Sequence, residues 1–298
     1  MDMGGRAQDP MDTKTGCLPM SESVELYRLP LLGGMDLLTA TYVTQAFSRH
    51  THDGYAVGVI ERGALRFRYR GETVCAASGS INLVVPGEAH DGQAACAQGW
   101  AYRMFYLRPE ALLSAAREMA ARPGLPHFRP GVLHDPGLAW LVQRAHAAAA
   151  DPATPALAKE TLTRRMLAAW VERHADGAWN WPRIGGERKA VRRVRELVRE
   201  RLREDISLAE LAQAAGLSPY HLVRVFERET GLPPHAYLVQ ARVEAARGLL
   251  AGPLPLAQVA AETGFADQSH LTRAFKRRHG LTPGRYRKIV QDSRYRPE

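Results

Sequence analysis

The chain has 298 residues, of which 45% are hydrophobic and 24% charged, a size and composition typical of a globular protein with two hydrophobic cores. It contains no run of the roughly 18–20 apolar residues that a membrane-spanning helix needs, and its polar first twenty residues do not resemble a secretory signal peptide, so we expect a cytoplasmic protein. The net charge of +9 is concentrated in residues 187–298, where 21 Lys and Arg stand against 13 Asp and Glu, which predicts a polyanionic partner for that part alone.

The first 175 residues are predicted to form a disordered leader, residues 1–20, and a first domain, residues 21–175. Cys17, Cys75 and Cys96 form no close pair in the sequence, and their odd number argues against a disulfide scaffold and against a thiolate metal site. Short β-type runs fill about residues 25–107, and the clearest are residues 55–60, 65–69, 80–85 and 102–107.

One of these runs shows strand periodicity directly, because Leu65, Phe67 and Tyr69 alternate with arginines. Glycine-containing turns separate the runs at residues 61–63, 70–71, 78–79 and 86–87. Short strands at even spacing with such turns predict a small β-barrel or jelly roll.

A helical pattern replaces the strands between residues 109 and 174. Asp135 and Pro136 begin one helix, which runs to about residue 150. A turn at residues 151–155 leads into a second helix, whose apolar stripe contains Leu162, Met166 and Trp170. Two helices joined by so short a turn form an antiparallel pair, which packs either on the barrel or against a second subunit. Residues 176–186 break every periodicity and are predicted to be the interdomain linker.

The last third of the chain contains an internal repeat. Residues 208–217 match residues 256–265 at an offset of 48, and residues 222–237 match residues 271–286 at an offset of 49. Helical hairpins are common in all-α domains, but two copies in register, in the basic part of the chain, favour a pair of helix-turn-helix units that bind DNA.

Each copy has the local signals of a helix-turn-helix. Gly216 and Gly264 stand where a left-handed residue ends the first helix, and Ser218 and Asp267 stand where a side chain caps the second. The second, recognition helices are predicted at residues 219–230 and 268–279. A connecting helix over about residues 233–250 could hold them one DNA turn apart, roughly 34 Å, in successive major grooves.

The apolar positions of the recognition helices leave a polar face that we expect to be exposed and to contact DNA. The candidate residues are Tyr220, His221, Arg224, Gln268, Ser269, His270, Arg273, Lys276 and Arg277. Arginine can pair with guanine and glutamine with adenine in the major groove, whereas the basic residues 276–278 are expected to meet phosphates.

Residues 191–288 resemble the paired helix-turn-helix domain of the AraC/XylS family of transcription regulators, including the segment 280–287 (GLTPGRYR). The resemblance implies double-stranded DNA as a partner, and activation or repression at a promoter, with RNA polymerase as a further partner. It also implies that Tyr220, Arg224 and the four residues from the second helix, Gln268 to His270 and Arg273, fall at positions that read bases. We assign residues 187–290 to this all-α domain and residues 291–298 to a tail.

The first domain is similar to the cupin-like sensing domain of the same family, in segments 50–52, 60–63, 79–90 and 100–109. The fold class is therefore α+β in two domains, and a small-molecule effector is expected in the barrel. Trp100 and the residues that follow it at a period of two share one face of a strand. The candidate ligand-binding residues are His50, His52, Arg62, His90, Tyr102, Met104 and Tyr106.

Three alternatives follow from the same residues. His50, His52 and His90, with Glu61 as a fourth group, could hold a metal, as in enzymes of the wider cupin group; a metal-dependent enzyme fused to a DNA-binding tail would result. Alternatively, a regulator could use its barrel only to dimerise. We favour a ligand-responsive regulator that is a homodimer, without enzymatic activity, metal or other cofactor.

Overall fold

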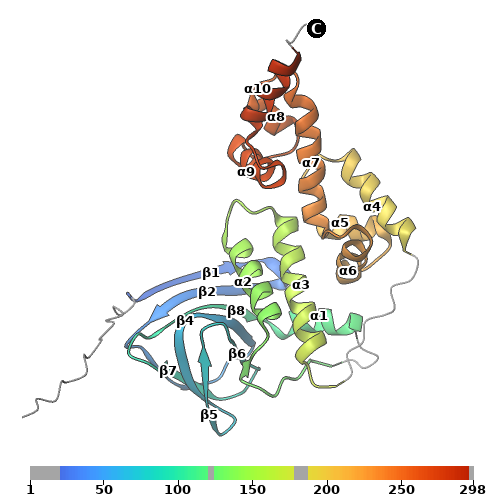
Figure 1. Cartoon of the computed structure of the whole chain (residues 1–298). Coiled ribbons are helices and arrows are strands. Elements are labelled where there is room, and N and C mark those ends of the chain that lie inside the picture. The colour runs from blue at the N-terminus through green and yellow to red at the C-terminus, as the bar shows by residue number, and fades with distance from the viewer. Residues whose placement is uncertain (1–20, 120–123, 178–186, 295–298) are drawn as a thin grey trace, which may run out of the picture.

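A computed structural model describes residues 21–119, 124–177 and 187–294 (Figure 1). The predicted leader, and residues 178–186 of the predicted linker, lie outside the described residues. The β-strands are β1 (Ser23–Leu29), β2 (Met35–Tyr42), β3 (Ala46–His50), β4 (Tyr55–Tyr69), β5 (Glu72–Ala77), β6 (Ile81–Val84), β7 (His90–Ala94), β8 (Trp100–Leu107) and β9 (Val132–Leu133), and a short 3-10 turn, Leu31–Gly33, follows β1.

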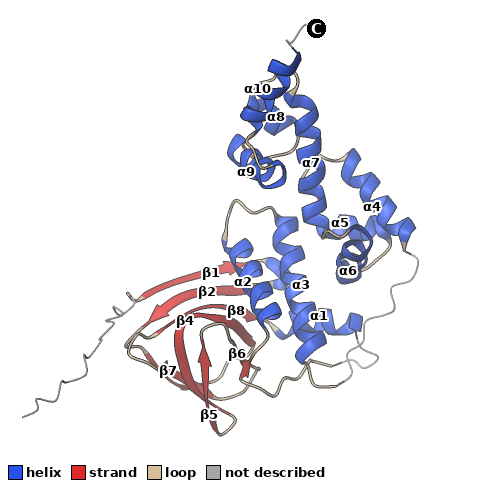
Figure 2. Ribbon diagram, viewed as in Figure 1, coloured by secondary structure: helices blue, strands red, loops and turns tan. Residues whose placement is uncertain are grey.

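The strands form an antiparallel barrel of two sheets that share β4. One sheet has the order β1-β2-β8-β4-β6-β9, and in the other β7 pairs with β3 and with the end of β4, which also pairs with β5. Figure 2 shows the strands curved around a common interior, with the helices on one side. The predicted barrel is confirmed, and we call residues 21–177 the barrel domain.

The strand β4 passes without interruption through residues 61–63, where the sequence predicted a turn, and this prediction is wrong. The register with β8 shifts between Ile60 and Arg62, which is a β-bulge. Gly63 has a φ of +68° and lies against the backbone of Gly99. The bulge bends β4 so that its two halves belong to different sheets.

Replacing Gly63 by alanine is expected to destabilise the barrel domain by at least about 2 kcal/mol, since a Cβ there would lie 1.9 Å from the Gly99 carbonyl oxygen in a backbone conformation that disfavours side chains. Urea unfolding followed by tryptophan fluorescence measures the loss. Gly79→Ala is the matched control, because its φ is +85° but no atom lies within 4 Å of its Cβ. Equal losses in the two variants would contradict the close contact.

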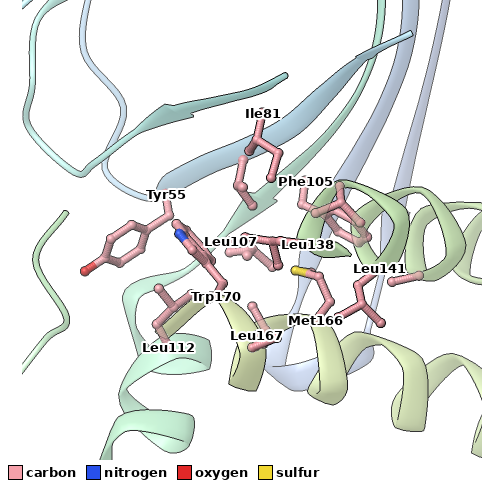
Figure 3. Close-up of a cluster of buried hydrophobic side chains, with 14 of the residues drawn as sticks. Tyr55, Ile81, Phe105, Leu107, Leu112, Leu138, Leu141, Met166, Leu167 and Trp170 are labelled. Atoms are coloured by element: carbon pink, nitrogen blue, oxygen red, sulfur yellow. The ribbon is translucent and has the colours of Figure 1, made fainter. Parts of the chain in front are cut away.

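Three helices lie on the outer side of the larger sheet: α1 (Pro109–Met119), α2 (Pro136–Ala150) and α3 (Ala156–His174), with α2 directly against β4 and β8, α3 packed on α2, and α1 packed on α3. The predicted helix pair, α2 and α3, therefore packs on the barrel. Figure 3 shows Trp170, Met166 and Leu138 from the helices packed against Phe105 and Ile81 from the sheet. The barrel interior forms a second buried cluster. Alternate residues of the sheet therefore point either to the core under the helices or to the core inside the barrel.

The last third of the chain is all helical, and we call residues 187–294 the helical domain. Its helices are α4 (Arg188–Glu200), α5 (Leu208–Ala215), α6 (Pro219–Thr230), α7 (Pro234–Leu250), α8 (Leu256–Glu262), α9 (Gln268–His279) and α10 (Pro283–Arg294). One core lies among α4, α5, α6 and the start of α7, and a second lies among the end of α7, α8, α9 and α10. The tail predicted from residue 291 begins inside α10. None of the helices in the described ranges combines the length and apolar composition that a bilayer crossing requires.

Candidate DNA interface and sensor pocket

The first helix-turn-helix consists of α5, a tight turn and α6. Gly216 ends α5 in the left-handed conformation. The Ser218 hydroxyl accepts a hydrogen bond from the His221 backbone N–H and so caps α6. Leu222, Val225 and Phe226 are buried beneath the helix, as their spacing predicted.

The second unit repeats this geometry with α8 and α9. Gly264 has a φ of +77°, and the carboxylate of Asp267 caps α9 by accepting a hydrogen bond from the His270 N–H. Leu271 and Phe275 anchor α9 in its core. Both recognition helices therefore have the bounds that the repeat predicted.

The outer face of α9 is free to meet a ligand. Its exposed polar and basic side chains are Gln268, Ser269, Arg273, Lys276, Arg277 and Arg278. Arg278 is partly engaged, since its Nε donates to Glu244 at 3.2 Å. His270 is half-buried, with its ring 5.1 Å from that of Phe265. Burial lowers the pKa of His270, as does the charge of Arg273.

The corresponding face of α6 is covered. Tyr220 was predicted to be exposed, and this prediction is wrong, because its side chain is only 1% exposed where α6 packs on the barrel domain. The guanidinium carbon of Arg164, on α3, lies 4.8 Å from the centroid of the Tyr220 ring. Tyr220 therefore belongs to the hydrophobic cluster of the barrel domain. His221 is also engaged, because its Nε2 lies 2.7 Å from Glu187 Oε1.

Further contacts join α6 to the barrel domain. Arg165 Nη2 on α3 donates to Glu227 Oε1 at 2.8 Å, and the Ser218 hydroxyl donates to Glu118 on α1. The domains are thus held by an ion pair, a cation–π contact and a charged hydrogen bond. We call these contacts the α3–α6 dock.

Carboxylates of the barrel domain also lie near the arginines that the sequence assigned to DNA. Burial lowers the pKa of Arg224, and three carboxylates oppose that shift: Glu172 and Glu118 from the barrel domain, and Glu187. The pKa of Asp151, in the turn between α2 and α3, is lowered first by hydrogen bonds from Thr154 and Ala153 and also by the charge of Arg273. Negative charge from the barrel domain therefore acts on Arg224 of α6, and more weakly on Arg273 of α9.

Six of the seven predicted ligand-binding residues line one cavity inside the barrel, of about 70 Å³: His50, His52, His90, Tyr102, Met104 and Tyr106. Arg62 does not line it, and that prediction is wrong, because the bulge in β4 leaves its side chain exposed. His52 and Tyr106 also border a larger pocket, of about 510 Å³, at the mouth of the barrel.

The three histidines lie together in the small cavity, and one ring nitrogen of each lies within 4.8 Å of the others. Burial and the nearby imidazoles lower the pKa of His52 to about 4 and also lower that of His90. Glu61 is not a fourth member, since its carboxylate accepts a hydrogen bond from Arg103.

Several residues that shape these sites were missed by the sequence analysis. Phe47 and Asn82 line the barrel cavity, and Arg164 and Arg165 hold the α3–α6 dock. Arg242 on α7 is only 3% exposed and donates to two backbone carbonyls before α5, Leu202 at 2.9 Å and Glu204 at 2.8 Å. No periodicity marks an arginine whose partners lie 38–40 residues away.

Comparisons with known families match both domains. The family model of an AraC-like ligand binding domain matches residues 32–164, and that of a helix-turn-helix domain matches residues 211–289. The uncharacterized HTH-type transcriptional regulator YbfI of Bacillus subtilis is 30% identical over 231 residues, which cover 77% of this chain and 82% of that protein. The arabinose operon regulatory protein of Escherichia coli is 26% identical over 245 residues, or 78% and 80% of the two chains.

Among solved structures, the DNA-binding domain of AdpA, in complex with a target DNA, is 28% identical, covering 36% of this chain and 98% of that one with a TM-score of 0.35. A point variant of ToxT from Vibrio cholerae, in its apo form, is 14% identical, covering 91% and 98% of the two chains with a TM-score of 0.35.

Proposed function

The chain belongs to the AraC family of transcriptional regulators, and we propose that its barrel domain controls DNA binding by covering the recognition helix α6. Membership of the family accounts for the DNA-binding and ligand-binding domains of the chain. The burial of Tyr220 against α3 is the observation that supports control of DNA binding by the barrel domain. Its role is that of a regulator rather than an enzyme, acting on DNA in the cytoplasm.

We expect α9 to be the recognition helix that contacts DNA bases in the docked arrangement. Its exposed face carries one side chain suited to adenine, Gln268, and one suited to guanine, Arg273, with Lys276 and Arg277 one turn further on. The second reader, α6, can enter a major groove only after the α3–α6 dock opens, since Val223 and Tyr220 are buried in the docked arrangement.

An effector would act by binding the docked and released arrangements with different affinities. The pocket of about 510 Å³ at the mouth of the barrel lies near the start of α1, because Pro109 and Glu110 line it. The same helix also contains Glu118, whose carboxylate accepts a hydrogen bond from Ser218 of the helical domain. A ligand in that pocket therefore contacts the helix whose other end takes part in the α3–α6 dock.

Homodimerisation is part of the same proposal, with a second copy on the outer side of the helix pair. Trp140 on α2 is 52% exposed, which is unusual for so large an apolar side chain. Activation at a promoter would add RNA polymerase as a further partner.

Arg273→Ala is expected to weaken binding to a DNA fragment selected by the wild-type chain by about 1–3 kcal/mol, and to relax the preference at one base pair, because a bidentate contact to guanine is lost. Lys276→Ala is the matched variant. It should weaken binding to all DNA sequences alike, and the binding constant should depend less steeply on salt concentration, by about one released counterion. Fluorescence anisotropy across single-base variants of the site measures both. An unchanged base preference in Arg273→Ala would remove this side chain from the reading surface.

A further inference from the structure

Three imidazole rings meet inside the barrel from two parts of the chain. His50 ends β3, His52 follows in the loop before β4, and His90 begins β7. Their ring centroids are 4.3 Å apart for His50 and His90, 4.8 Å for His50 and His52, and 4.9 Å for His52 and His90. One nitrogen from each ring can therefore reach a common point.

Backbone carbonyls orient two of the rings. His50 Nδ1 lies 2.7 Å from the Ser48 carbonyl oxygen, and His90 Nδ1 lies 3.1 Å from that of Glu88. A carbonyl only accepts hydrogen bonds, so Nδ1 of each ring is the donor, and in the neutral imidazole Nε2 is then the nitrogen that can bind a metal. Metal-binding histidines are typically oriented by such a hydrogen bond from their second nitrogen.

The cluster has no hydrogen bonding of its own that would explain it. Among the described residues, no hydrogen bond joins the three rings to one another. One nitrogen of each ring lies within 4.8 Å of the others, and a cation between them would bind the lone pairs of all three.

The ligand atoms and the size of the cavity indicate which cation would bind. Three neutral imidazoles suit Zn²⁺ and its neighbours among the divalent transition metals rather than Mg²⁺ or Ca²⁺, which prefer oxygen ligands. The cavity of about 70 Å³ has room for an ion with a small additional ligand. Buried Asn82 Oδ1, which lines the same cavity, has no hydrogen-bond partner in the described structure.

We propose that His50, His52 and His90 bind one divalent transition-metal ion of the zinc type, with an open coordination position inside the barrel, in place of the metal-free barrel expected from the sequence. The three imidazole ligands carry no charge, although the carboxylate of Asp91 also lines the cavity, so the open position would take a small anionic oxygen donor, hydroxide or a carboxylate. The identity of this donor rests on the sensor role proposed above, but the metal site does not.

The test uses the full chain, stripped with a chelator and then titrated with Zn²⁺ or Co²⁺ alone. We expect one ion per chain, a Co²⁺ spectrum typical of four-coordination, and a rise in the midpoint of thermal unfolding that Mg²⁺ does not produce. His50→Ala, His52→Ala and His90→Ala should each weaken metal binding at least tenfold, whereas His134→Ala, an exposed histidine elsewhere in the barrel domain, should leave it unchanged.

His52→Gln keeps the side-chain volume and is the second variant if an alanine variant does not fold. Absence of stoichiometric binding to the wild-type chain would overturn the proposal, as would binding that survives substitution of all three histidines. Because no DNA enters these measurements, their failure would leave the proposed regulator role standing, and a failure to bind DNA would leave the metal site standing.

Discussion

Replacing Arg164 and Arg165 together by alanine is expected to strengthen binding to a selected DNA fragment about thirtyfold in the absence of effector. The reason is that these two side chains hold α6 against α3, through the ring of Tyr220 and the carboxylate of Glu227. A partly desolvated cation–π contact and a half-buried ion pair together contribute about 2 kcal/mol to the docked arrangement. Removing them shifts the population toward the released arrangement, in which α6 can reach DNA.

The direction of this effect is what makes it informative. The variant loses two positive charges, and simple electrostatics predicts weaker binding to a polyanion. Arg66→Ala combined with Arg68→Ala is the matched control, because it removes two exposed arginines from β4, which packs in the barrel away from α6. Anisotropy titrations of both proteins at one salt concentration make the comparison. Equal or weaker binding by the Arg164 and Arg165 variant would show that the dock does not limit DNA binding.

The two recognition helices could be predicted to the residue because their signals are local. A left-handed glycine, a capping side chain and an apolar i, i+3, i+4 pattern all lie within about twenty residues of each other, as in the segment from Gly264 to His279. The conformation of such a segment depends little on the rest of the chain.

The exposure of α6 could not be predicted in the same way. Tyr220 stands at a position that is polar by helical spacing, and what buries it is α3, some sixty residues earlier. Which helix packs on which domain depends on shape and charge across the interface, for which a single sequence has no periodic signal. The same applies to Arg62, whose direction follows from a one-residue bulge that reverses the alternation along β4.

The barrel cavity was predictable because alternation in β8 already places Tyr102, Met104 and Tyr106 on one face. That His90 would meet His50 and His52 depends on the pairing of β3 with β7, which brings residues forty apart into register. The orientation of the His50 and His90 rings depends on backbone carbonyls whose positions no sequence pattern predicts.

Lowering the pH from 7 to 4 is expected to destabilise the barrel domain, and His146 is expected to account for about 3 kcal/mol of the loss. Its side chain is completely buried between α2 and the sheet, with its ring 5.3 Å from that of Phe105. Neither ring nitrogen has a hydrogen-bond partner of normal geometry, although the backbone of Leu38 and Met104 lies nearby. Burial, and secondly the charge of Arg103, lower the pKa of His146 from 6.5 to about 4.

The sign follows from proton uptake. Between pH 6.5 and about 4 the unfolded chain binds a proton on His146 that the folded chain does not, so unfolding becomes easier as the pH falls through this window and the effect levels off below it. His146→Leu, an apolar side chain of similar volume, should match the wild-type free energy of unfolding at pH 5 or exceed it, and should show a shallower pH dependence. Urea unfolding of the full chain at several pH values, followed by fluorescence, makes the measurement, because all five tryptophans precede the helical domain. A pH profile as steep in His146→Leu as in the wild-type chain would mean that another group of the barrel domain, such as His52, whose pKa burial also lowers to about 4, causes the acid sensitivity instead.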